Sequence, residues 1–179
     1  MMNLTTSSKG DGLAKLAADL QKISNMDVLV GVPESNAARK EEGINNAQLL
    51  ALHTKGSPLQ KIPARPVIEP AIEASGNKEQ IAEQLGIAAQ LVLDQNVPGA
   101  HAQLQKTAML GQNVARSWFT DPRNNWPPNK IATVRAKMSK MTSKQVFEAV
   151  DSGTPITRPL VDTGALRQAI IGICREKKD

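Results

Sequence analysis

Apolar residues recur every three to four positions over 12–24, so they fall on one side of a helix. They are Leu13, Leu16, Ala17, Leu20 and Ile23. The next segment, 27–32, reads DVLVGV; it is short, rich in β-branched residues and closed by Pro33. This pattern predicts a strand buried on at least one face. The polar segment 34–44 predicts a loop.

A short helix is expected over 46–54, with Asn45 or Asn46 as its cap and Gly56 as its stop. After it, 56–66 contains Pro58, Pro63 and Pro66. Proline fixes φ and removes a backbone donor, so this segment predicts a stiff, extended connection.

A long helical hairpin is predicted over about 70–118. Pro70 suits a first helical turn, and Gly76 is a weak point in the helix that follows. Its expected apolar stripe is Ile81, Leu85, Ala88 and Val92. The sequence NVPG at 96–99 interrupts the pattern. The second helix, 100–118, has an expected buried face of Leu104, Ala108, Gly111, Ala115 and Trp118.

The rest of the chain completes an α+β pattern. Prolines and asparagines make 119–130 irregular, and short helices are expected over 130–140 and 143–151. A helical turn over 164–168 and a strand over 169–174 follow, and this strand is a natural antiparallel partner for 27–32. A segment near 66–69 is a candidate third strand. We therefore predict a single α+β domain over 1–179, with a small antiparallel sheet packed by helices and a basic, proline-rich and helical arm at about 119–158.

Composition narrows the possible functions. Aromatic residues make up only 2% of the 179 residues, so the core is expected to be aliphatic and base stacking is nearly excluded as a binding mode. The single Cys174 excludes an internal disulfide and zinc sites built on paired cysteines. No apolar run is long enough for a membrane span or a signal peptide, so we expect a chain made and kept in a cytoplasm.

The sequence offers little for catalysis. His53 and His101 are the only histidines, and neither belongs to a recognisable catalytic or metal-binding motif. His53 lies near a predicted helix C-terminus, where the helix dipole accounts for a neutral or partly charged imidazole. We expect no enzymatic activity, no cofactor and no metal.

Positive charge is concentrated in one segment. The whole chain has a net charge of +5, whereas 122–147 contains six basic residues and no acid: Arg123, Lys130, Arg135, Lys137, Lys140 and Lys144. The segment is either a solvated arm or a docking surface for an acidic partner, protein or phosphate. The aromatic pair Trp118 and Phe119, together with Trp126, either anchors an interface or covers the core of the hairpin.

Three stretches carry a family resemblance when taken in order. They are VLVGVPES at 28–35, NAQLLALHTKGSPLQKIPARPVIEPAIEA at 46–74, and PLVDTGALRQAIIGICRE at 159–176. Together they resemble the tail-completion or neck proteins of long-tailed bacteriophages, also called virion morphogenesis proteins. The resemblance covers the N-terminal half and the last 20 residues; 75–158 is similar mainly in its helices, its Trp-Pro loop and its basic stretch.

The resemblance implies a non-enzymatic α+β subunit that assembles into a ring, often of six or twelve copies. The ring would join the DNA-filled head to the tail, with portal-side connector proteins on one side and tail terminator or tail tube proteins on the other. The protein would reside in the virion neck, and in the host cytoplasm during assembly. DNA contact in the channel is compatible with that role; a membrane is not expected. The alternatives are a nucleic-acid-binding accessory protein that uses 122–147, and a small enzyme such as a hydrolase.

Residue roles follow from the same stretches. Pro63 and Pro66 would hold Arg65 in an extended turn, from which its guanidinium could bridge to Asp162. Asp162 or Thr163 would cap the turn before the last strand, and Gly164 would supply backbone freedom. The structural motif residues are thus Pro63, Arg65, Pro66, Asp162, Thr163, Gly164 and Leu166. The candidate partner-interface residues are Trp126, Lys130, Arg135, Lys137, Lys140 and Lys144.

Overall fold

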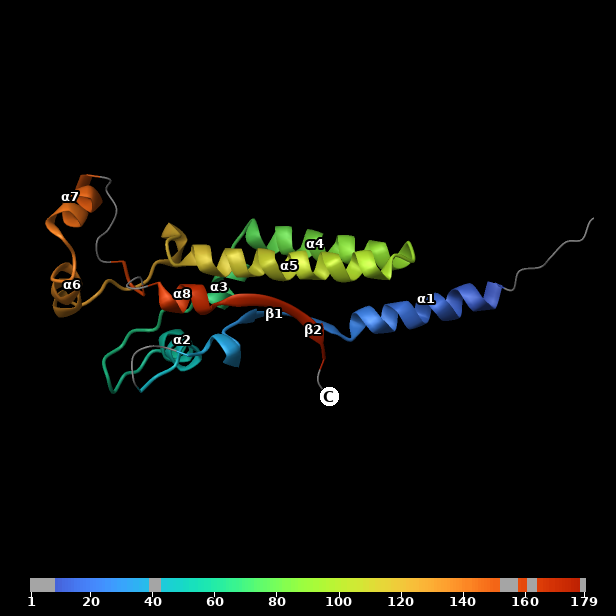
Figure 1. Cartoon of the computed structure of the whole chain (residues 1–179), viewed down its shortest axis with the longest axis horizontal. Helices are drawn as coiled ribbons and strands as arrows, with labels where there is room; N and C mark the ends of the chain where they lie inside the picture. The colour runs from blue at the N-terminus through green and yellow to red at the C-terminus, as the bar shows by residue number, and fades with distance from the viewer. Residues whose placement is uncertain (1–8, 39–42, 152–157, 161–163, 178–179) are drawn as a thin grey trace, which may run out of the picture.

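The computed structural model describes residues 9–38, 43–151, 158–160 and 164–177. It is mostly helical with a small two-stranded antiparallel sheet, which confirms the α+β class (Figure 1). In chain order the elements are α1 (Lys9–Ser24), β1 (Met26–Gly31), a 3-10 turn (Glu34–Asn36), α2 (Asn46–Lys55), α3 (Ile68–Glu73), α4 (Asn77–Leu93), α5 (Val97–Trp118), a second 3-10 turn (Pro122–Asn124), α6 (Ile131–Met138), α7 (Ser143–Asp151), α8 (Ala165–Ala169) and β2 (Ile171–Glu176).

The sheet joins two distant parts of the chain. β1 and β2 pair antiparallel, with Val28 opposite Cys174 and Val30 opposite Gly172. The predicted pairing is confirmed. The second strand, however, begins at Ile171 rather than at 169, because 165–169 forms α8. The strand expected near 66–69 is wrong, since α3 already begins at Ile68.

The long helix α5 forms the centre of the fold. It packs against α4 and α3, and against both strands of the sheet (Figure 1). Its predicted buried face is confirmed: Leu104, Ala108, Gly111, Ala115 and Trp118 are all buried. The main apolar cluster joins α2, α3, α5 and α8 through Leu50, Val67, Ala71, Val114, Ala115, Trp118, Phe119, Leu166 and Ile170.

The first arm of the hairpin differs from the sequence expectation. The helix starting near Pro70 is divided into α3 and α4, and Gly76, at φ 83°, precedes α4. The stripe on α4 is also rotated: Ala88 and Val92 are buried as expected, but Leu85 is 41% exposed. Gln84 faces α5 instead, where its Oε1 accepts a hydrogen bond of 2.6 Å from Gln103 Nε2. A polar pair therefore lies between the two helices of the hairpin.

Helix α1 extends away from the body of the molecule (Figure 1). It has a limited number of contacts with α4, α5 and β1. Its predicted apolar stripe is only partly covered: Leu13 is 70% exposed and Leu20 is 43% exposed. At the opposite end of the molecule lie α6 and α7, which belong to the basic arm. Helix α1 thus lies far from the helices of the basic arm (Figure 1).

Candidate functional site

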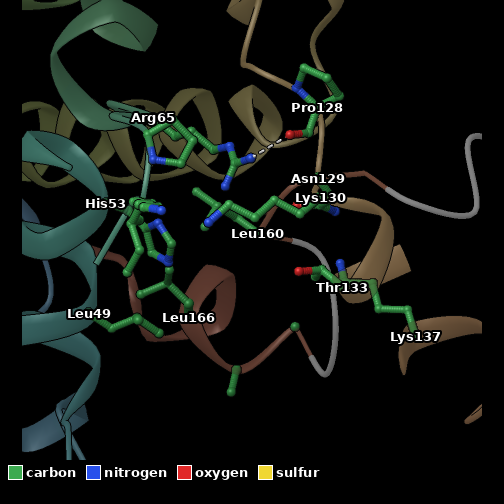
Figure 2. Close-up of a pocket in the computed structure, with 15 residues that line it drawn as sticks. Leu49, His53, Arg65, Pro128, Asn129, Lys130, Thr133, Lys137, Leu160 and Leu166 are labelled. Atoms are coloured by element: carbon green, nitrogen blue, oxygen red, sulfur yellow. Dashed lines mark hydrogen bonds between the residues drawn. The ribbon is translucent and has the colours of Figure 1, made fainter. Parts of the chain in front are cut away.

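A cavity of about 740 Å³ lies between α2, the proline-rich loop, the start of α6 and α8 (Figure 2). It is lined by six residues that the sequence singles out: Pro63, Arg65, Lys130, Lys137, Gly164 and Leu166. Four of the motif residues and two lysines of the basic arm therefore meet at one site, although Pro63, Lys130 and Leu166 are far apart in the sequence.

Arg65 connects three of these segments. Its side chain is buried, with the residue only 6% exposed. Its Nε and Nη2 donate to the carbonyl of Pro127 at 3.1 and 2.8 Å, and Nη2 also donates to the carbonyl of Pro128 at 3.1 Å. Its backbone N–H donates to the carbonyl of His53 at 2.6 Å. Through these bonds Arg65 links the proline-rich loop to the start of the arm and to α2.

The carboxylate partner expected for Arg65, Asp162, lies outside the described residues, as does Thr163 with its expected cap. Within the described chain the guanidinium bonds to backbone carbonyls instead. Proline has no N–H, but its carbonyl remains a full acceptor, so consecutive prolines suit a charged donor. Gly164 precedes α8 at φ 77°, the left-handed conformation that glycine adopts without strain.

Trp126 covers the core and is half-buried. Its Nε1 donates to the carbonyl of Pro66 at 3.1 Å. Its ring meets Phe119 edge to face, with the centroids 5.8 Å apart. Of the two roles open from sequence, the structure places Trp126 in the core cover. The proline-rich loop thus holds the arm at two points, Pro66 to Trp126 and Arg65 to the carbonyls of Pro127 and Pro128.

The charged groups that line the cavity are all basic within the described chain. They are Lys61, Arg65, Lys130 and Lys137, with His53 beside them. Apolar side chains form much of the remaining wall: Leu49, Ile62, Pro63, Leu160 and Leu166. A second hollow of about 450 Å³, on the other side of α2, carries one lysine and one glutamate, Lys55 and Glu69. The excess of positive charge is therefore a property of the first cavity.

The surroundings of His53 favour its neutral form. Burial lowers the pKa of its imidazole, and the nearby positive charge of Arg65 lowers it further. Its Nδ1 is buried and has no hydrogen-bond partner in the described chain. The helix dipole considered from sequence would favour the charged form, but desolvation outweighs it here.

The other basic residues of 122–147 are arranged differently. Arg123 forms an ion pair with Asp121 at 2.7 Å and lies 5.6 Å from the centre of the Trp118 ring. Lys144 lies 3.8 Å from Glu148. Both acids flank the segment by one residue, so a count limited to 122–147 overstates its field. Arg135, Lys140 and Lys144 do not line the cavity.

Lys137 is half-buried and donates to the carbonyl of Arg158 at 2.9 Å. It is therefore also a structural residue of the arm. Sequence reasoning missed the contributions of Lys61 and Leu160 to the cavity, and it treated His53 as structural only. The sequence does contain a signal for Lys61: basic residues lie two positions before and two positions after Pro63, at 61 and 65.

Three further observations bear on the site. No group of three or more histidine, cysteine or acidic residues that could hold a metal occurs in the described ranges. Nor does any helix among them have the length and apolar character needed to cross a membrane. Comparison of the chain with protein-family models, with curated proteins and with solved structures gives no match.

Proposed function

We propose that this protein is a structural subunit of a bacteriophage neck, which assembles in several copies and joins the DNA-filled head to the tail. The observation that carries the proposal is the convergence of the three stretches that bear the resemblance. β1, from the first stretch, pairs with β2, from the third. α2, from the second, packs against α8, from the third. A shared ordered set of motifs that also packs as one unit supports a common architecture.

The uncovered apolar surface supports assembly. Val30 faces α5, where it contacts Gly111, so the alternate residue Leu29 lies on the outer face of the sheet. There it is 37% exposed, and its cross-strand partner Ile173 shares that face. Leu13 and Leu20 of α1 are exposed as well. Exposed apolar side chains of this kind are buried in contacts between the subunits of an oligomer.

The nucleic-acid-binding alternative has weaker support. Two of the six basic residues of 122–147, Arg123 and Lys144, lie beside flanking acids. Trp126, the aromatic residue within the segment, is held against Pro66 and Phe119. The segment therefore lacks the continuous basic surface with stacking aromatics that single strands favour.

The test is deletion of the gene from the phage genome that encodes it, followed by negative-stain electron microscopy of the lysate. Filled heads beside separate full-length tails are expected. Complementation with K130E/R135E, two exposed residues of the arm, is expected to restore fewer joined particles than complementation with the matched pair K15E/K106E on α1 and α5. Normal virions in the deletion lysate would overturn the proposal.

A further inference from the structure

We propose that the cavity between α2, the proline-rich loop and α6 binds an acidic peptide segment of a partner protein, with an apolar side chain of that segment seated between the leucines of the wall.

The charge of the cavity selects an anion. Lys61, Arg65 and Lys130 all line it, and no carboxylate does so within the described chain. Arg65 is buried and bound to neutral carbonyls, so its charge is not cancelled by an ion pair with a described residue. Like charges held close together repel one another, and a bound carboxylate relieves that repulsion while forming charge-assisted hydrogen bonds.

The walls of the cavity favour a peptide over nucleic acid. Leu49, Ile62, Leu160 and Leu166 present aliphatic side chains between the cations. A phosphate backbone gains little from such a surface, and among the described residues no phenylalanine or tryptophan lines the cavity to stack on a base. An acidic residue next to a leucine or isoleucine matches both components, the cations and the aliphatic wall. About 740 Å³ accommodates a few side chains of this kind.

The cavity is held open by its own hydrogen bonds. On one side of it, Arg65 donates a hydrogen bond to the carbonyl of Pro128 (Figure 2). Two further bonds join Arg65 to the carbonyl of Pro127. Pro63 and Pro128 stiffen the two backbones that line it. A site that is formed before binding loses less conformational entropy when a peptide enters, which favours affinity.

The proposal rests on the composition of the cavity and holds whichever assembly the protein serves. The neck function would fail in the deletion lysate, whereas this inference fails or stands in a binding titration of the purified protein.

The experiment is a fluorescence-anisotropy titration of the full chain at about 0.15 M salt. The probe is a fluorescein-labelled peptide of about eight residues that alternates glutamate and leucine. Three matched probes accompany it: one with glutamine for glutamate, one with serine for leucine, and an oligothymidylate of equal charge. The first probe is expected to bind at least about tenfold more tightly than each of the other three.

Two variants locate the binding. K61N/K130Q removes two cations of the cavity; Asn is chosen at 61 because Lys61 has φ 54°, which asparagine tolerates. We expect it to weaken the first probe at least about tenfold. K15Q/K106Q removes two exposed cations that do not line the cavity and is expected to bind as the wild type does. Circular dichroism melting confirms that each variant is folded.

Every other outcome overturns the inference. Absence of binding, equal binding of the serine probe, or tighter binding of oligothymidylate would each exclude an acidic and apolar peptide as the ligand. Equal weakening by both lysine pairs would show that only the net charge of the protein matters.

Discussion

Gly172 in β2 lies directly against the backbone of Ala108 in α5, with no space for a side chain between them. A Cβ atom at Gly172 would overlap the carbonyl of Ala108. The backbone N–H of Gly172 also donates to Gln112 Oε1 at 3.1 Å. One turn further along α5, a Cβ atom at Gly111 would come within 2.7 Å of Val30 Cγ2. The sheet therefore rests on α5 through backbone and small residues.

Replacing Gly172 by alanine is expected to destabilise the fold by about 3 kcal/mol or more, because the obstacle is helix backbone, which cannot move aside without shifting α5. Urea denaturation followed by circular dichroism measures the change. G86A is the matched control: Gly86 lies inside α4 with open space around it, so alanine should stabilise by about 0.5–1 kcal/mol. Equal effects of the two substitutions would contradict this account.

Replacing Arg65 by methionine keeps most of the side-chain volume but removes the donors to Pro127 and Pro128. We expect a loss of about 2–3 kcal/mol, since three hydrogen bonds from a charged group are lost. Faster proteolysis within 127–151 should accompany the loss, because the arm is then released from the loop. R167M, at an exposed position of α8, is the control and should change neither readout.

Stability should fall as the solution is acidified, in part through His53. Its pKa is lowered in the folded state from the usual 6.5, by burial first and by Arg65 second. The unfolded chain therefore binds more protons than the folded one below about pH 6.5, so the contribution is complete above that pH and is lost as the pH falls toward the folded pKa. Urea midpoints at about pH 7.5 and 5.5 test this. H53Q should show a smaller drop than the wild type; an equal drop would assign the effect to other groups.

The exposed leucines of α1 offer a test of self-association. L13S/L20S should cost about 1 kcal/mol or less in stability, because both side chains are already largely in water. If α1 contributes to subunit contacts, the variant should remain monomeric at concentrations where the wild type sediments as an oligomer. L59S, at an exposed turn position, is the matched control. Unchanged sedimentation of the double variant would remove α1 from the interface.

Most elements could be predicted from local patterns. The cap of α2 is an example, since Asn45 and Gln48 form a reciprocal capping pair within four residues of sequence. The buried face of α5 is another, because its period is that of the helix itself. The errors occur where contacts between residues distant in the sequence determine the structure. Gln84 rather than Leu85 faces α5, and Gln103 on the opposing helix donates a hydrogen bond to it. β2 begins two residues later than predicted because 165–169 forms helix α8, which packs against α2.

Several residues of the candidate site could be predicted from the sequence, but the sequence did not indicate that they meet in one cavity. Arg65 is notable in the sequence because it lies between Pro63 and Pro66, whereas Lys130 is notable because it belongs to a basic segment. What brings them together is a bond from a guanidinium to backbone carbonyls, and no side-chain pattern encodes such a partner. The charge of 122–147 was overstated for a related reason: Asp121 and Glu148 fall just outside the window but lie beside residues within it.

The pairing of β1 with β2 also sets an order of events during synthesis. Met26 lies opposite Glu176, so the first strand leaves the ribosome long before its partner exists. The hairpin of α4 and α5 is a local structure and can form early, whereas the sheet must wait for the last turn and strand. Until then β1 presents two unpaired edges. A chain interrupted before residue 171 therefore has no sheet, and its outer apolar face is never built. Only chains that have been translated as far as β2 can carry that face.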